Sequence, residues 1–213
     1  MDIKPVLGSK NRPSHVSACF TGNHTEGLLA AADQACRKNL INGFNGNLSI
    51  RNNEYVLITC SGAAKAFLKP RDLCVLRLET GEKMEGRCRA SSEAGMHLEI
   101  YRQQPQARAI VHTHPVALLS LTGARGISSL RDMNLFEASS LMEDLALIPD
   151  YRPGSTDLAR AVGRASKEAR AVFMSRHGLT CWGSTPEQAL ALSEELEALA
   201  AVRLNQLLLQ ACT

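Results

Sequence analysis

Short blocks of apolar residues alternate with polar stretches along the chain, and their spacing predicts strands and helices in alternation. Two blocks at 48–50 and 55–59 lie on either side of a polar turn, which predicts a β-hairpin. Similar blocks predict further strands at 73–78, 109–114, 145–148, 171–174 and 179–182. Apolar residues at helical spacing predict helices at 25–38, 91–104, 116–121, 158–166 and 184–210. Residues 127–144 show no clear period.

Several of these strands follow one another after tight turns, which favours a largely antiparallel or mixed sheet with helices packed on its faces. At 213 residues and 45% apolar content, the chain is long enough to bury a proper core, and no repeat or linker divides it. Residues 1–22 carry Pro and Gly without periodicity. We therefore expect an irregular N-terminal arm over residues 1–22 and a single domain over residues 23–213.

The composition argues against several classes of partner. The formal charge is only +3 and there is no Lys/Arg-rich block, so we expect no nucleic-acid binding. The apolar runs are shorter than the roughly 20 residues that cross a membrane, so we expect no membrane association. The first residues lack the apolar segment of a signal peptide, which predicts a cytoplasmic protein. The seven cysteines are scattered without a CxxC pair, which predicts reduced thiols.

Two histidines stand at the end of one predicted strand. His112 and His114 are two residues apart, so in an extended chain their side chains point to the same face. Pro115 cannot donate to a ladder of backbone hydrogen bonds and ends the strand. Two adjacent imidazoles of this kind can bind one metal ion, although the spacing alone also fits two solvated histidines.

Two further residues could complete a metal site. His177 lies in a predicted tight turn, where Gly178 is expected to let the backbone turn sharply beside the ring. A third imidazole would give a three-histidine site with an open coordination position, as in catalytic zinc sites, unless His177 faces water. Glu93 follows two serines at the head of a predicted helix, where an acidic residue is also favoured simply by the helix dipole.

Three dipeptides combine small residues with hydroxyl, amide or backbone N–H donors. They are Gly46-Asn47, Ser61-Gly62 and Ser91-Ser92. The last of these precedes a predicted helix, and the N-terminus of a helix is a natural site for a phosphate group. Taken singly, each dipeptide fits a turn or a helix cap better than a binding loop.

Five segments of the chain, taken together, match one protein family. They are Gly46-Asn-Leu-Ser49, Ile58-Thr-Cys-Ser-Gly62, Ser91-Ser-Glu93, Val111-His-Thr-His-Pro115 and Arg176-His-Gly-Leu179. In the content and order of these segments the chain resembles the class II aldolase/adducin-head family. The resemblance covers most of residues 25–205.

This resemblance implies an α/β fold in three layers, α/β/α, with a mainly antiparallel central sheet. It implies that His112, His114 and His177 bind Zn²⁺ and that Glu93 is the catalytic acid/base. It also implies a cradle for the phosphate of a small-molecule sugar phosphate, formed by Gly46, Asn47, Ser61, Gly62, Ser91 and Ser92. Family members are usually homotetramers with active sites at subunit interfaces, so we expect the same assembly here.

The activity that the resemblance implies is cleavage of a ketose 1-phosphate to dihydroxyacetone phosphate and an aldehyde, through an enediolate that the metal stabilises. Family aldolases place one tyrosine after the histidine strand and another near the C-terminus. This chain has Asn134-Leu-Phe-Glu137 in the first region, and no tyrosine follows Tyr151. Phe136-Glu137 is similar to the methylthioribulose-1-phosphate dehydratase branch of the family, which makes Glu137 an alternative acid/base.

Two other functions stay open on the sequence. One is a different metal-dependent sugar-phosphate lyase or epimerase. The other is a non-catalytic scaffold like the adducin head, which would not need all three histidines together with Glu93.

Overall fold

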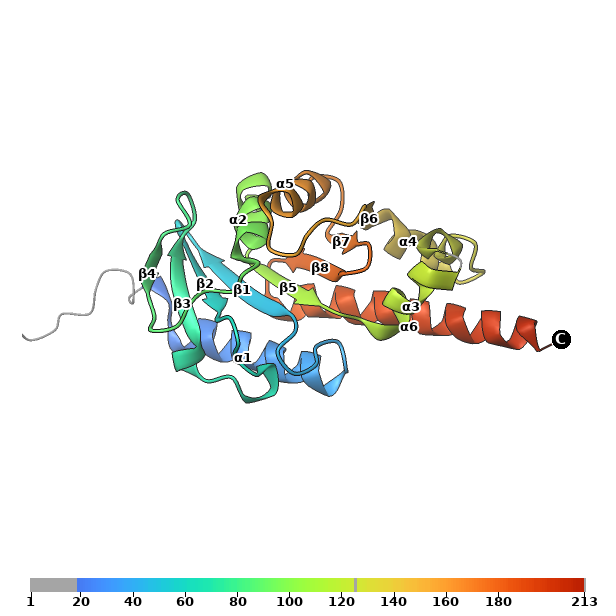
Figure 1. The fold of residues 1–213 in the computed structure, drawn as a ribbon, viewed down its shortest axis with the longest axis horizontal. Helices are drawn as coiled ribbons and strands as arrows, with labels where there is room; N and C mark the ends of the chain where they lie inside the picture. The colour runs from blue at the N-terminus through green and yellow to red at the C-terminus, as the bar shows by residue number, and fades with distance from the viewer. Residues whose placement is uncertain (1–18, 125, 213) are drawn as a thin grey trace, which may run out of the picture.

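The computed structural model describes residues 19–124 and 126–212 (Figure 1). The strands are β1 (Asn47–Asn52), β2 (Tyr55–Thr59), β3 (Leu73–Arg77), β4 (Lys83–Glu85), β5 (Ala109–Thr113), β6 (Leu145–Ile148), β7 (Ala171–Met174) and β8 (Gly178–Gly183). The helices are α1 (Gly22–Arg37), α2 (Ala94–Gln103), α3 (Val116–Ala124), α4 (Phe136–Glu143), α5 (Thr156–Ala165) and α6 (Pro186–Ala211). Short 3₁₀ turns lie at Lys65–Phe67, Pro70–Asp72 and Ile127–Leu130.

Within the described residues the strands form one eight-stranded sheet in the order β4-β3-β2-β1-β5-β8-β7-β6. Strands β6 and β7 run parallel, because α5 connects them and returns the chain to the same edge, whereas the other neighbours pair antiparallel. Helices α2 and α5 cover one face of the sheet, and α1 and α6 cover the other (Figure 1). The predicted fold class, a three-layer α/β/α domain with a mainly antiparallel sheet, is confirmed.

The alternation of side chains along the strands explains why two of the three hydrophobic clusters lie on opposite faces of the sheet. Val56 and Ile58 of β2 belong to the cluster that includes α2 and α5, whereas Leu57 belongs to the cluster that includes α1. Strand β5 divides in the same way, with Ile110 in the first cluster and Val111 in the second. Because both faces are apolar, each face needs a layer of helices to cover it.

The predicted elements are confirmed wherever a strong pattern or cap marks them. Strands β2, β6 and β7 have the predicted bounds. Ser155 caps α5 by accepting a hydrogen bond of 3.1 Å from the backbone N–H of Leu158. Thr185 caps α6 in the same way, at 3.3 Å from the N–H of Gln188. Of the expected arm over residues 1–22, residues 1–18 lie outside the described part of the chain, and α1 already begins at Gly22.

The prediction that all the cysteines are reduced thiols is wrong for one pair. Cys60 and Cys88 are joined in a disulfide, with their Cα atoms 5.9 Å apart. Cys60 follows β2 and forms an isolated antiparallel bridge with Ala90, so the β2-β3-β4 meander brings together two segments that are distant in sequence. Among the residues that the structure describes, no helix is both long and apolar enough to cross a membrane.

The strand register assembles one functional end of the sheet. Asn47 of β1 pairs with His112 of β5, and His112 pairs with Thr180 of β8 on its other side. His177 lies in the turn just before β8. Residues from three neighbouring strands in the middle of the sheet therefore meet at one end of these strands.

Candidate functional site

The three predicted histidines converge. Nε2 of His112 and Nε2 of His114 lie 3.1 Å apart, and ligand atoms from His112, His114 and His177 all lie within 4.8 Å of one another. The three imidazoles therefore surround one point, and their ligand atoms are close enough together to bind a single metal ion.

The hydrogen bonds of His112 test whether a metal fits. Its Nδ1 lies 3.0 Å from the carbonyl oxygen of Leu179, which can only accept, so Nδ1 carries the proton in that hydrogen bond. Nε2 of the same ring points the other way, and it lies 3.1 Å from Nε2 of His114 and 3.2 Å from Oε2 of Glu93. Two ring nitrogens this close fit a shared cation, and a backbone partner on the far side is the usual way to orient a histidine ligand.

Burial keeps the second histidine neutral. Burial, together with the neighbouring His112 and His177, lowers the pKa of His114 to about 3, although Glu93 acts in the opposite direction. A neutral imidazole is the form that binds a metal. The ring is therefore prepared for a ligand role over the whole physiological range.

The turn that carries His177 differs in one respect from the prediction. The positive φ of 57° falls on Arg176, and not on Gly178. Gly178 is needed for space, because a Cβ there would lie 2.5 Å from the carbonyl oxygen of Thr113 and 3.0 Å from Cε1 of His112. The glycine thus allows β8 to approach the histidine strand closely enough for the rings to meet.

Glu93 lies directly beside the histidines. Its Oε1 is 2.9 Å from Nε2 of His177 and its Oε2 is 3.2 Å from Nε2 of His112. Burial raises the pKa of this carboxyl group, but the charge and hydrogen bonds of His112 and His177 outweigh burial and hold the pKa well below its usual range. Glu93 is therefore a carboxylate in this arrangement, able to accept a proton.

A buried polar network supports Glu93 from behind. Nδ2 of Asn47 donates to Oε2 of Glu93 at 2.9 Å, and Oδ1 of Asn47 lies 2.5 Å from Nε2 of His97. The other ring nitrogen of His97 lies 2.7 Å from Oγ of Ser49, which in turn lies 2.8 Å from Oη of Tyr101. Burial lowers the pKa of His97 to about 3, so this ring is neutral.

Sequence reasoning missed this network. The signal available was the spacing of Glu93 and His97, since residues four apart lie on the same face of a helix. Their partners Asn47 and Ser49 lie on β1, and only the fold brings them there.

A cavity of about 270 Å³ opens in front of the histidines, and the predicted phosphate loops line it. Its lining contains Glu93, His114 and His177 together with Gly46, Asn47, Ser61, Gly62, Ser91 and Ser92. Oγ of Ser91 accepts a hydrogen bond of 3.2 Å from the N–H of Glu93, which fixes the chain just before α2. The structure thus brings the metal, acid/base and phosphate candidates into one site.

Lys65 is a cation in this cavity that the sequence did not reveal. The residue is only 2% exposed, and its Nζ donates to the carbonyl oxygens of Phe44 at 3.2 Å and Ala63 at 2.8 Å. Burial lowers the pKa of its ammonium group. An ammonium group has three N–H donors, so one more remains for an anion in the cavity.

Glu137 does not join this site within one chain. It lies on the exposed side of α4, in an apolar groove between α4 and α6 that also contains Leu135 and Leu199. The position offers no contact with the histidines inside the same subunit. The alternative acid/base role of Glu137 therefore stays a prediction without geometric support from this chain.

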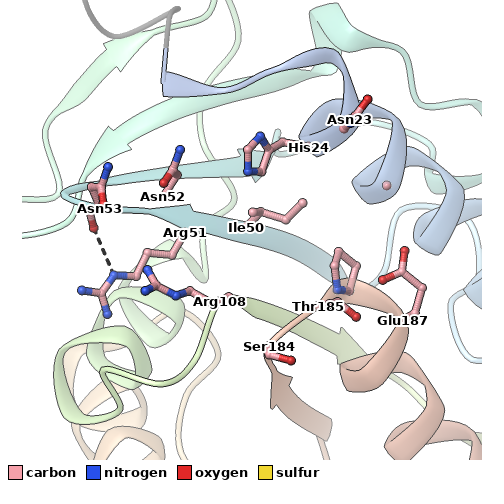
Figure 2. A pocket seen from close by; sticks show the side chains of 12 residues that line it. Asn23, His24, Ile50, Arg51, Asn52, Asn53, Arg108, Ser184, Thr185 and Glu187 are labelled. Carbon is pink, nitrogen blue, oxygen red and sulfur yellow. Dashed lines mark hydrogen bonds between the residues drawn. The ribbon is translucent and has the colours of Figure 1, made fainter.

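A second cavity, of about 460 Å³, lies at the opposite ends of the same strands (Figure 2). Arg51 and Arg108 point into it from the end of β1 and the start of β5, and His24 contributes from α1 (Figure 2). Among the described residues that line this cavity there is no predicted metal or phosphate ligand.

Comparison with known proteins agrees with the geometry. Residues 26–204 match the model of the class II aldolase and adducin N-terminal domain family. The chain belongs to this family. The prediction that the chain is a class II aldolase, a metal-dependent carbon–carbon lyase, is confirmed at the level of that class.

Relatives within the family have several named activities. The chain is 31% identical over 168 residues to an L-fuculose phosphate aldolase of Methanococcus vannielii, covering 78% of this chain and 87% of the relative. It is 31% identical over 175 residues to a 5-methylthioribulose-1-phosphate/5-deoxyribulose-1-phosphate aldolase of Escherichia coli, covering 82% and 80%. It is 32% identical over 158 residues to a 3-oxo-tetronate 4-phosphate decarboxylase of Haemophilus influenzae, covering 73% and 74%.

Solved structures agree with the class II aldolase fold. The L-fuculose-1-phosphate aldolase of Thermus thermophilus superposes with a TM-score of 0.73 at 28% identity, covering 88% of this chain and 96% of that chain. A sugar-phosphate aldolase of Thermotoga maritima superposes with a TM-score of 0.79 at 24% identity, covering 88% and 97%, and shows the fold alone.

Proposed function

We propose that the protein is a zinc-dependent aldolase that cleaves a ketose 1-phosphate into dihydroxyacetone phosphate and an aldehyde. The observation that carries this proposal is the position of Glu93, whose two carboxylate oxygens lie within 3.2 Å of His177 and His112 at the inner end of a cavity lined by phosphate-type loops. A scaffold protein would have no use for this arrangement.

The three histidines are the residues that would hold Zn²⁺. Neutral nitrogen ligands suit zinc, and three of them leave a coordination position for substrate. The cation supplies Lewis-acid stabilisation of the negative charge that develops on the substrate oxygens when the carbon–carbon bond breaks. The protein must supply the proton transfer and the orientation.

Glu93 is the group that moves the proton. After cleavage, the dihydroxyacetone phosphate half must gain a proton at the carbon that lost its partner, and in the reverse direction it must lose that proton. The carboxylate faces the cavity, and the hydrogen bond from Asn47 holds one of its oxygens in place. Asn47 is therefore proposed to orient Glu93 as well as to line the phosphate cradle.

The phosphate is proposed to bind where the loops of Gly46, Ser61-Gly62 and Ser91-Ser92 meet. Gly46 has φ of 68°, and a Cβ there would lie 2.7 Å from the carbonyl oxygen of His112, so the loop packs directly against the metal site. Lys65 adds a positive charge. Binding energy from the phosphate then orients the bond that reacts.

The assembly that fits this surface is a homotetramer with active sites at subunit interfaces. Large apolar side chains are exposed on α4 and near the end of α6, including Phe136 at 100%, Leu208 at 64% and Leu209 at 71%. The last turns of α6 extend beyond the other elements (Figure 1). Exposed apolar surface of this kind is typical of a partner interface. A neighbouring subunit could supply the group at the aldehyde end that this chain lacks in place of the family's tyrosines. The cytoplasmic location of the protein stays a prediction.

A product assay tests the function. The zinc-loaded protein is incubated with L-fuculose 1-phosphate, 5-deoxyribulose 1-phosphate, 5-methylthioribulose 1-phosphate and 3-oxo-tetronate 4-phosphate. Dihydroxyacetone phosphate with an aldehyde supports the proposal. Loss of water from an intact carbon chain would assign the protein to dehydratases, and release of carbon dioxide from the last compound alone would assign it to decarboxylases.

A further inference from the structure

The disulfide between Cys60 and Cys88 lies directly beside the proposed phosphate cradle. Ser61 follows Cys60 in the chain, and Ser91 is three residues after Cys88. We propose that Cys60 and Cys88 form a reversible redox site, whose disulfide braces the two phosphate loops and whose reduction loosens them. The disulfide itself is independent of the proposed function, whereas its effect on substrate binding rests on that function.

The two cysteines are held together whether or not they are bonded. The N–H of Ser61 donates to the carbonyl oxygen of Arg89 at 2.9 Å, and the N–H of Ser91 donates to that of Thr59 at 3.2 Å. These hydrogen bonds keep the segments paired, and the Cα separation of 5.9 Å is usual for disulfides. The sulfur–sulfur bond can therefore form and break without unfolding of the neighbouring strands.

Redox reagents have a route to Cys88 that avoids the active site. Cys60 is buried and lines the site cavity, but Cys88 is half-buried and lines a different cavity of about 620 Å³. Lys83, Arg87 and Arg89 line this second cavity, and Nζ of Lys83 donates to the carbonyl oxygen of Cys88 at 3.1 Å. Positive charge attracts anionic thiols and favours the reactive thiolate.

A third cysteine lies in the same cluster but is poorly suited to react. The sulfur of Cys74 lies within 4.8 Å of the sulfurs of both bridged residues. Cys74 is only 1% exposed, and burial raises its pKa to about 11, although Lys83 acts in the opposite direction. Cys88 is therefore the entry point for exchange, and Cys60 is its partner.

The chemistry balances with a hydroperoxide as the oxidant and a small thiol as the reductant. The Cys88 thiolate attacks the peroxide, the O–O bond breaks, an alcohol or water leaves, and a sulfenic acid remains on Cys88. The Cys60 thiolate then displaces hydroxide, which leaves as water, and the S–S bond forms. The two thiols lose two electrons and the peroxide gains them. Two equivalents of a thiol reverse the process through a mixed disulfide.

Peptide mapping of the zinc-loaded full chain tests the pairing without any need for turnover. The protein is treated with hydrogen peroxide or with dithiothreitol, its free thiols are alkylated, and it is digested with trypsin. After oxidation we expect alkylation of the five cysteines outside the bridge, and a cross-link between the peptides of residues 52–65 and 88–89. After reduction of the folded protein we expect all seven cysteines to be alkylated under denaturing conditions.

Three results would overturn the redox site. These are seven alkylated thiols after oxidation, a cross-link that includes the Cys74 peptide of residues 72–77, or a bridge that dithiothreitol does not reduce in the folded protein. A second equivalent of zinc in the reduced chain that Cys74→Ser removes would also overturn it, because the cluster would then be a metal site.

Kinetics test the bracing of the cradle. Substrate binding loses less conformational entropy when the phosphate loops are already ordered. We therefore expect KM for the ketose 1-phosphate to rise about three- to tenfold on reduction, with kcat little changed. Cys88→Ser should show the higher KM in both redox states, whereas Cys36→Ser, on α1, should respond like the wild type. A KM that is the same in both states refutes the bracing. An absence of all cleavage activity refutes the proposed function instead and leaves the peptide map valid.

Discussion

The side-chain amide of Asn47 donates a hydrogen bond of 2.9 Å to Oε2 of Glu93, although 46 positions separate the two residues in the chain. The same amide receives its own orientation from His97, at 2.5 Å on the other side. The carboxylate beside the histidines is therefore held by a buried chain of contacts, and not only by the metal site.

This contact predicts the effect of Asn47→Ala. Misplacing the carboxylate should lower kcat by about 10- to 100-fold, since a small displacement of a catalytic group has a large effect on rate. If Asn47 served only the phosphate, KM would rise and kcat would hold. Steady-state kinetics of the variant separate the two roles, with Asn45→Ala at the edge of the cavity as the control.

The buried His97 predicts a pH dependence of stability. Its folded-state pKa of about 3 lies below the ordinary 6.5, because burial disfavours the charged ring. Between these values the unfolded chain binds a proton that the folded chain does not, so stability is full above pH 6.5 and falls as the pH decreases toward 3. The slope from one such group is about 1.4 kcal/mol per pH unit.

Denaturant unfolding of the metal-free protein at several pH values between 5 and 7.5 measures this slope. His114, whose pKa is also lowered to about 3, adds to the slope in the wild type and in a His97 variant alike, and Glu93 contributes only near and below its ordinary value of 4.5. His97→Gln should make the pH dependence of the free energy of unfolding shallower, by the contribution of about one proton, than that of the wild type. Equal slopes in the two proteins would show that His97 is not held neutral.

The close approach of β8 to the histidine strand predicts that Gly178→Ala damages the metal site. A Cβ at this position would meet the carbonyl oxygen of Thr113 and the rings of His112 and His114. We expect a loss of about 1–3 kcal/mol of stability and weaker zinc binding. Gly95→Ala, on α2, is the matched control, because its Cβ would find its nearest neighbour at 3.7 Å. Zinc affinity in Gly178→Ala equal to that of the control would contradict the packing account.

Lys65 predicts a phosphate-specific effect. A hydrogen bond to a charged group contributes about 1.5–3 kcal/mol, so Lys65→Met should raise KM for the ketose 1-phosphate about tenfold or more. The reaction of the corresponding ketose without phosphate should change little. Lys69→Met, on the exposed side of the neighbouring segment, serves as the control. A similar loss with both substrates would mean that Lys65 only stabilises the loop.

The sequence predicts those parts of the molecule that depend on local pattern. The continuous apolar runs at 55–59 and 171–174 give two strands with their observed bounds, and the spacing of His112 and His114 gives two rings on one face. Helix α4 escapes prediction because only Ala138 and Met142 of its eight residues are buried, so it has no apolar stripe.

The rest depends on contacts between distant segments. His97 becomes part of the site only because β1 brings Asn47 and Ser49 to it. Lys65 is buried, and its ammonium group donates to the carbonyl oxygens of two loop residues. No local sequence pattern predicts this position. The bridge between Cys60 and Cys88 likewise follows from the meander of three strands.

The most direct test of the account is the zinc content of His177→Ala measured beside that of Glu93→Gln. If three histidines hold one ion and Glu93 moves the proton, the wild type binds one zinc per chain. Glu93→Gln should keep the zinc while its rate falls about 10²- to 10⁴-fold. His177→Ala should lose the metal. Full zinc occupancy in His177→Ala, or a wild-type chain that binds none, would contradict the central claim.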